Sequence, residues 1–254
     1  MTIWGRILGG AAGFALGGPL GALLGLAAGY GIERLHALSR DDGAADDDPT
    51  KQIAFTIAVI ALGAKMSKAD GRVTQDEVRA FREVFHVPPD EMRNVARVFD
   101  LAKRDVAGYE VYARQIGRLL RNDQGLLEEL IDALFHIAKQ GGGVQAVELE
   151  FLANVARIAG LSDEHFQRLK ASHLDEDDGD PYGILGVPRN ADDDTLRRAW
   201  KRLVREHHPD ALVARGLPPD FMRLAERKLA AINAAYDRIR IERGQKPVAS
   251  EPVS

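Results

Sequence analysis

The feature that most constrains this chain is a stretch near its start, from Ile7 to Ile32, that contains no charged residue. As an α-helix, these 26 residues would extend about 39 Å, which exceeds the roughly 30 Å hydrocarbon core of a bilayer. Trp4 and Tyr30 lie near its two ends, where aromatic side chains favour the membrane interface. The stretch therefore predicts a membrane-spanning helix, and we assign residues 1–35 to a membrane anchor.

Glycine recurs at every fourth position of this anchor. On a helix, that spacing places positions without side chains along one face, which lets a second helix approach closely in lipid. In water so many glycines would destabilise a helix by about 1 kcal/mol each, whereas in lipid the cost of unpaired backbone groups enforces the helix. The face is predicted to mediate helix packing in the lipid bilayer, with a homodimer as one outcome. Its members are Gly9, Gly13, Gly17, Gly21, Gly25 and Gly29.

The charges around the anchor bear on its orientation. Arg6 precedes it, and Arg34 and Arg40 follow it. The positive-inside rule then favours a single-pass protein whose C-terminal side is cytoplasmic. A cleaved signal peptide and a flexible tail are the alternatives. A signal peptide normally has a shorter apolar core, and a tail would not carry Leu, Ile and Phe on its other faces.

Two acidic stretches divide the rest of the chain into helical pieces. Clusters of aspartate make such stretches charged, extended and solvated, as is typical of linkers. Apolar residues recur at helical spacing in both pieces, and no convincing alternating strand pattern is present, so the fold is predicted to be all-α. The predicted segments are an acidic linker at 36–51, a helical domain at 52–172, a second acidic linker at 173–179, a C-terminal module at 180–243 and a flexible tail at 244–254.

The C-terminal module is basic although the chain has a net charge of −4. Residues 181–243 contain 13 Lys or Arg against 9 Asp or Glu. The pattern predicts a short helix at 181–185, a longer one over 192–207 that ends before Pro209, and another that begins at Pro218. Two antiparallel helices would form a hairpin, with the tripeptide His208-Pro209-Asp210 exposed at its tip.

This module resembles the J domain of DnaJ-type co-chaperones. The resemblance lies in three motifs in order, namely Asp180–Val187, the tripeptide after a basic helix, and Ile232–Tyr236. The middle domain resembles the TerB (tellurite resistance) family. The opening residues Trp4–Gly9 and the run Glu206–Pro219 are similar to the membrane-anchored DnaJ-like proteins of the DjlA type.

The resemblance implies a co-chaperone of the bacterial inner membrane that docks on a DnaK-type chaperone and stimulates its hydrolysis of ATP. The tripeptide would be the signature of docking, and the basic helix would steer an acidic partner surface. The chain has no phosphate-binding loop and no nucleophile, so it is predicted to be an activator and not an enzyme. The implied docking residues are His208, Pro209, Asp210, Arg198, Lys201, Arg202 and Arg205.

Neighbouring residues of the module have simpler interpretations. His207 is predicted to face the core and not to bind a metal, and Trp200 and Tyr236 are predicted to pack and not to stack on bases. Because the chain is acidic overall, nucleic acid is not expected as a partner. The absence of cysteine excludes disulfides, thiolate zinc sites and cysteine nucleophiles. No cofactor is predicted.

Asp70 and Glu77 of the middle domain have two interpretations. The resemblance to TerB implies that they could belong to a metal or acidic-ligand site. Alternatively, Asp70-Gly71 is a turn, and Thr74 with Glu77 forms a helix capping box. Capping is preferred, because two scattered carboxylates are too few for a hard cation.

Two other functions stay open at this stage. One is a metal- or stress-responsive membrane scaffold that acts through the TerB-like domain. The other is a periplasmic protein with a cleaved leader, which would separate the J module from any ATP-driven partner.

Overall fold

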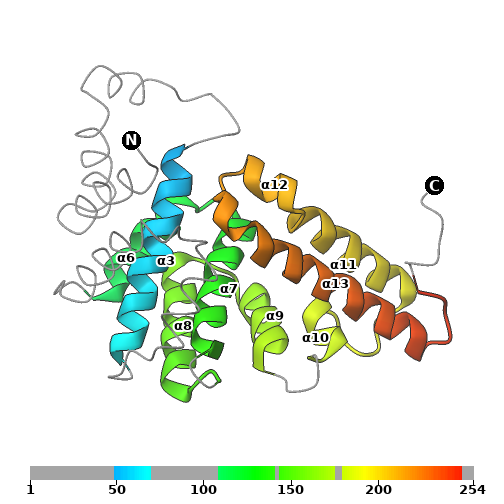
Figure 1. Cartoon of the computed structure of the whole chain (residues 1–254). Coiled ribbons are helices and arrows are strands. Elements are labelled where there is room, and N and C mark those ends of the chain that lie inside the picture. Colours follow the sequence, from blue (N-terminus) through cyan, green and yellow to red (C-terminus); the bar gives the residue numbers. More distant parts are fainter. Residues whose placement is uncertain (1–48, 70–107, 141–142, 175–178, 248–254) are drawn as a thin grey trace.

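The computed structural model describes residues 49–69, 108–140, 143–174 and 179–247. All regular structure within these residues is helical, which confirms the all-α prediction (Figure 1). The predicted anchor with its glycine face lies outside the described residues, and so do Asp70 and Glu77. No helix in the described part of the chain is long and apolar enough to cross a membrane.

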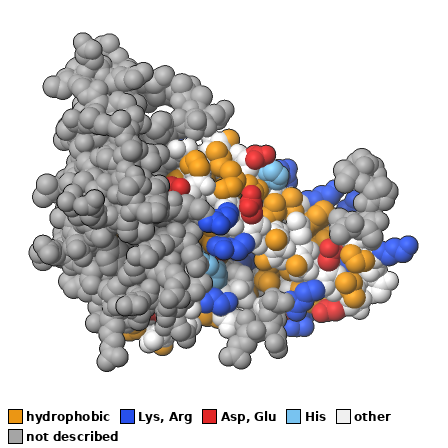
Figure 2. All heavy atoms as spheres, viewed as in Figure 1, with side chains coloured by type: hydrophobic (Ala, Val, Ile, Leu, Met, Phe, Trp, Pro, Cys, Tyr) orange, Lys and Arg blue, Asp and Glu red, His pale blue; other side chains and the backbone are white. Residues whose placement is uncertain are grey.

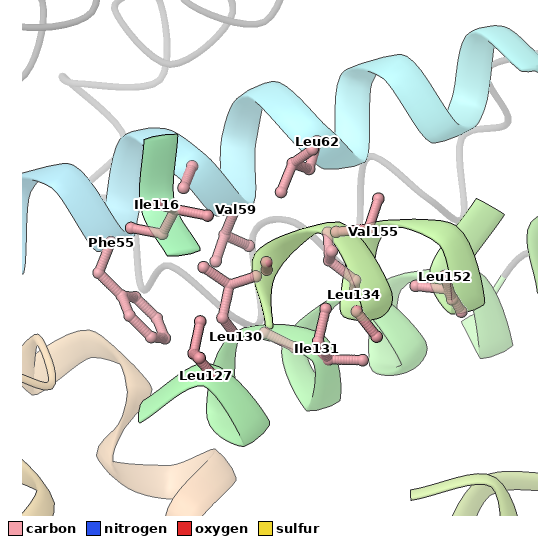
Figure 3. Close-up of a cluster of buried hydrophobic side chains, with 14 of the residues drawn as sticks. Phe55, Val59, Leu62, Ile116, Leu127, Leu130, Ile131, Leu134, Leu152 and Val155 are labelled. Atoms are coloured by element: carbon pink, nitrogen blue, oxygen red, sulfur yellow. The ribbon is translucent and has the colours of Figure 1, made fainter. Parts of the chain in front are cut away.

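The first helical domain is a bundle built around one central helix. Helix α7 packs against α3, α8 and α9, and its apolar side chains meet those of α3 and α8 in a continuous core (Figure 3). Helix α3 begins within the stretch that the sequence assigns to the first linker. The helices of the bundle are α3 (Pro49–Ala69), α6 (Tyr109–Leu119), α7 (Gln124–Gln140), α8 (Ala146–Ala159) and α9 (Asp163–Leu174).

Local sequence signals determine the residues at which α8 begins and ends. The backbone N–H of Gln145 donates to Glu148 Oε2 at 2.9 Å, which satisfies a free donor at the start of the helix. Gly160 ends the helix with a φ of 87°, a left-handed conformation that glycine adopts without a steric penalty. A Cβ atom on Gly117 of α6 would lie 2.3 Å from the carbonyl oxygen of Ala159, so glycine at this position lets α6 and α8 cross closely.

The second domain is a helical hairpin with two short helices attached. The predicted helices at 181–185 and 192–207 are confirmed, with Asp192 and His207 as the caps of the longer one. A short helix after the hairpin turn was not predicted. It begins at Pro209, whose fixed φ and missing N–H suit the first position of a helix. The helices are α10 (Pro181–Leu185), α11 (Asp193–Glu206), α12 (Pro209–Ala214) and α13 (Met222–Glu242), with a 3₁₀ turn at Pro219–Phe221.

The hairpin contributes to two separate cores. Its far end has its own core, in which Trp200 stacks on Tyr236 with ring centroids 4.6 Å apart, so the packing interpretation of these two aromatics is confirmed. Its tip belongs to the core of the bundle, because Leu212, Leu217 and Phe221 lie in the same cluster as the side chains of α3 and α7. Figure 1 shows the beginning of α13 beside the bundle and its end far from it. The second domain is therefore packed onto the bundle at the tip of its hairpin.

A second contact holds the start of the second domain to the bundle. Helix α10 packs against α9, and a Cβ atom on Gly179 would lie 2.7 Å from the carbonyl oxygen of Ala171. Arg168 of α9 reaches the same region, since its Cδ lies 3.0 Å from where a Cβ on Gly186 would be. Contacts at α10 and at the hairpin tip together set the orientation of the hairpin relative to the bundle.

Candidate partner-docking site

Four of the five basic residues of α11 are the predicted docking residues, and they lie on one exposed face of the helix. Arg198, Lys201, Arg202 and Arg205 are all exposed, as expected for residues spaced by three and four along a helix. In Figure 2, Lys and Arg side chains occur over the hairpin half of the visible face, among hydrophobic side chains. The face adjoins the bundle, because Arg202 Nη2 donates to Glu164 Oε1 of α9 at 3.0 Å.

The tripeptide lies at the turn between α11 and α12. His208 occupies the position before α12 with an extended backbone, Pro209 is the first helical residue, and Asp210 follows in the first turn. The side chains of His208 and Asp210 are 50% and 88% exposed, with Nδ1 of the one 3.9 Å from Oδ2 of the other. The structure thus places an accessible imidazole and an accessible carboxylate at the C-terminal end of the basic helix.

His207, unlike its neighbour His208, is fully buried. Its Nδ1 lies 2.9 Å from Glu129 Oε1, and its Nε2 lies 3.5 Å from Glu128 Oε2. The distance to Glu129 is that of a good hydrogen bond. The distance to Glu128 is too long for a good hydrogen bond but short enough for an ion pair. The prediction that His207 faces the core is confirmed, and the core that it faces is charged.

This charged core is an ionic cluster between the bundle and the hairpin. Lys228 of α13 lies 3.0 Å from Glu128 Oε1 and 3.2 Å from Glu129 Oε1, while Arg168 donates to Glu128 Oε2 at 2.8 Å. His173 of α9 is bound to Asp132 at 2.7 Å. The three carboxylates are almost fully buried, so each needs the cations around it. We define the ionic cluster as Glu128, Glu129, Asp132, Arg168, His173, His207 and Lys228.

The cluster favours the charged forms of Glu128, Asp132 and Lys228. Burial alone would raise the pKa of Glu128, but the cations around it, first among them Lys228, hold that pKa well below its usual value. The pKa of Asp132 is lowered for the same reason, by Lys228 and by its hydrogen bond to His173 against the effect of burial. Although burial opposes it, the carboxylates raise the pKa of Lys228 above its usual value.

The pKa of His207 is raised as well. Burial and the Lys228 ammonium both lower this pKa, but the contacts with the carboxylates of Glu128 and Glu129 outweigh them. Lys228 and Arg168 pair with Glu128, and His173 pairs with Asp132, while the imidazolium form of His207 lies against Glu129. The charged form of His207 therefore stabilises the contact between the two domains.

Replacing His207 with glutamine is expected to cost more stability at about pH 6 than at about pH 9. A histidine whose pKa is raised on folding contributes fully below its unfolded pKa, and the contribution is lost as the pH rises through the folded value. Urea unfolding of both proteins across this range measures the difference. The pKa of His165 is lowered, mainly by burial, so its own effect has the opposite sign but is present in both proteins.

A variant of the acceptor serves as the matched comparison for this prediction. Glu129→Gln removes the charge that accepts from His207 Nδ1, so it is expected to flatten the same part of the pH profile. Parallel stability profiles for the wild type and His207→Gln would contradict the assignment of a charged His207 to the interface.

The sequence analysis did not single out the acidic residues of this cluster. Glu128, Glu129 and Asp132 lie opposite the apolar face of α7, where a two-sided amphipathic helix would expose them to water. The packing of α9 and of the hairpin on that side buries them instead. The sequence nonetheless held a signal for a buried polar site. His207 was expected to face inward, and a buried imidazole requires a polar partner.

Family models match three successive segments of the chain. The transmembrane domain of the co-chaperone DjlA matches residues 1–44, the tellurite resistance protein TerB matches residues 56–171, and the DnaJ domain matches residues 180–243. The matches to TerB and to DnaJ cover the bundle and the hairpin described above. The match to DjlA covers the charge-free segment with its glycine face.

Curated relatives match along nearly the whole chain. The co-chaperone protein DjlA of Photobacterium profundum is 30% identical over 277 aligned residues, which cover 96% of this chain and 100% of the relative. The protein of the same name from Coxiella burnetii is 26% identical, with 93% and 96% covered, and that from Salmonella typhimurium is 26% identical, with 97% and 100% covered. No solved structure matches the chain.

Proposed function

This chain belongs to the family of DjlA co-chaperones, and we propose that its J module docks on a DnaK-type chaperone and stimulates the hydrolysis of ATP by that partner. The observation that carries the proposal is the exposure of His208 and Asp210 at the end of a helix whose five basic residues are all accessible, four of them proposed for docking. The proposed docking residues are His208, Pro209, Asp210, Arg198, Lys201, Arg202 and Arg205.

The two parts of this surface have different tasks in the proposal. The basic face attracts an acidic surface of the partner and fixes its register, which affects the rate of association most. The tripeptide supplies directional contacts, since an imidazole and a carboxylate can donate and accept hydrogen bonds while Pro209 restricts the backbone between them. The chain acts as a regulator in this scheme, and the chemical step takes place in the partner.

The same proposal places the J module at the cytoplasmic face of the inner membrane. Support comes from the charge-free segment, from the match of residues 1–44 to a transmembrane domain, and from the arginines that follow the segment. ATP is available on that side for a DnaK-type partner. The glycine face of the anchor is proposed to pack against a second copy of the same helix.

The test is the ATPase rate of a purified DnaK-type chaperone in the presence of the full-length protein in lipid nanodiscs. We expect His208→Gln and Asp210→Asn each to abolish the stimulation, because each removes one directional contact at an accessible site. The matched control is His165→Gln, a histidine on α9 outside the proposed docking surface. Equal stimulation by the wild type and His208→Gln, or none by either, would refute the proposal.

The metal-responsive scaffold gains no support from the ionic cluster. Its carboxylates are already paired with Lys228, Arg168 and two histidines. Among the residues that the structure describes, no group of three or more His, Asp or Glu side chains could hold a metal ion. A site at Asp70 and Glu77 stays a prediction.

A further inference from the structure

We propose that the TerB-like bundle positions the tripeptide for docking, and that Arg215 is the residue through which it does so. The inference rests on the proposed function, because it concerns the geometry in which the tripeptide meets the partner. It assigns to the bundle a part in the action of the J module, and it makes Arg215 a positioning residue that need not touch the partner.

Arg215 joins the two sides of the tripeptide. Its Nη2 donates to the backbone carbonyl of Glu206, the last residue of α11, at 2.5 Å. Its Nε donates to the backbone carbonyl of Ala211, the residue that follows the tripeptide, at 3.2 Å. The guanidinium thereby bridges the backbone just before and just after the residues that carry the proposed function.

The same guanidinium is fixed to the bundle. Its Nη1 donates to Asp123 Oδ1 at 3.1 Å, and this oxygen also accepts from the backbone N–H of Leu126 at 3.0 Å. Asp123 is thus the cap of α7, held by its own helix and favoured there by the helix dipole. A side chain that caps a helix has little freedom, so it gives Arg215 an acceptor of fixed position.

The N-terminal end of α7 has room for the guanidinium because residue 125 is glycine. A Cβ atom on Gly125 would lie 3.1 Å from both Nη atoms of Arg215, closer than such atoms normally approach. Arginine also suits the task better than lysine, since its planar fork presents donors in several directions at once. The three acceptors lie on three different segments of the chain.

A second contact from α7 reaches the residue next to the tripeptide. His207 immediately precedes His208, and its ring is held by Glu129 and lies near Glu128. The backbone on either side of the tripeptide is thus attached to α7. His207 makes the attachment before the tripeptide, and Arg215 makes it through the carbonyls of Glu206 and Ala211. These attachments set the directions in which the side chains of His208 and Asp210 point. The hydrogen-bonding groups that the two side chains offer do not depend on the attachments.

Removing Arg215 is expected to disturb the orientation of the tripeptide while its three residues stay unchanged. For full-length protein in nanodiscs, we expect Arg215→Met to lower the maximal stimulation of the partner ATPase about tenfold, as small misplacements of binding groups do. The concentration that gives half-maximal stimulation should change by less than about twofold, because the basic face that steers association is intact. Arg215→Lys should not restore the maximum, and Asp123→Asn should lower it less, because its amide oxygen can still cap α7.

A second measurement does not depend on the partner. Hydrogen exchange of the amides of residues 207–212 in the protein alone should be faster in Arg215→Met than in the wild type. The matched control is Arg243→Met, which breaks an arginine–aspartate pair with Asp193, 2.6 Å long, at the opposite end of the hairpin. It should change neither the exchange of these amides nor the maximal stimulation.

The outcomes separate this inference from the proposed function. Unchanged exchange at residues 207–212 in Arg215→Met would show that the guanidinium does not hold the loop. Faster exchange with undiminished stimulation would show that the partner does not need the orientation. Either result overturns the positioning role while the wild type still stimulates. A wild type that fails to stimulate refutes the proposed function and, with it, the inference.

Discussion

Replacing Lys228 with methionine is expected to lower the free energy of unfolding by about 3–5 kcal/mol, the usual cost of breaking a buried ion pair on one side. The ammonium lies within 3.2 Å of both Glu128 and Glu129, and its side chain is only 11% exposed. Methionine keeps the length and the apolar part of the side chain, so the loss comes from leaving buried carboxylates without their cation. Urea unfolding followed by circular dichroism measures the difference.

Two further variants identify the cause of that loss. Arg227→Met on the same helix removes an exposed cation and should change stability by less than about 0.5 kcal/mol. Adding Glu129→Gln to Lys228→Met should recover part of the loss, because it removes one of the charges left unpaired. The loss should also shrink below about pH 5, where unpaired buried carboxylates take up protons. A loss that neither the second substitution nor acid reduces would mean that the ion pairs do not carry it.

Replacing Phe221 with alanine is expected to cost about 3–5 kcal/mol, as truncation of a buried aromatic residue does. Phe221 is 1% exposed and meets Phe55 of α3 edge to face, with ring centroids 4.9 Å apart. Because Phe221 belongs to the hairpin and Phe55 to the bundle, the truncation should weaken the attachment between the domains. Hydrogen exchange should become faster in α3 as well as in residues 217–225.

The control for this prediction lies on the same long helix. Ile241 of α13 is 59% exposed, and Ile241→Ala should change stability by less than about 0.5 kcal/mol and leave the exchange of α3 unaltered. If Phe221→Ala accelerated exchange in the hairpin alone, the two domains would be energetically independent, in conflict with a shared core.

Much of the candidate site could be predicted from the sequence, because the sequence signals that define it act over a few residues. Pro209 ends one helix and starts another, and the spacing of Arg198, Arg202 and Arg205 places them on one face whatever the helix packs against. An exposed tripeptide follows from a turn between two antiparallel helices. These features depend on backbone geometry over a few residues, so no knowledge of the remaining chain is needed.

The contacts that attach the tripeptide to the bundle could not be predicted in this way. Arg215 and Asp123 are 92 residues apart, and His207 and Glu129 are 78 apart. Arg215, Asp123 and Glu129, taken alone, each resemble an ordinary solvated charge, and the prediction that His207 faces the core did not name its partner. Their pairing depends on how two domains pack, and helical periodicity carries no information on that.

The sequence by itself thus determined the helical character of the chain, the basic helix with its tripeptide, and the charge-free segment at the start. Helical periodicity and proline stops act over one or two turns of helix. A long apolar run has one favourable environment, the hydrocarbon core of a bilayer. Only the tertiary structure decided that the apolar stripe of α13 serves two cores and that the acidic side of α7 is buried. The free energy of burying a charge depends on the partners that packing brings to it. In this protein Arg168 and His173 come from another helix of the bundle, while Lys228 and His207 come from the other domain.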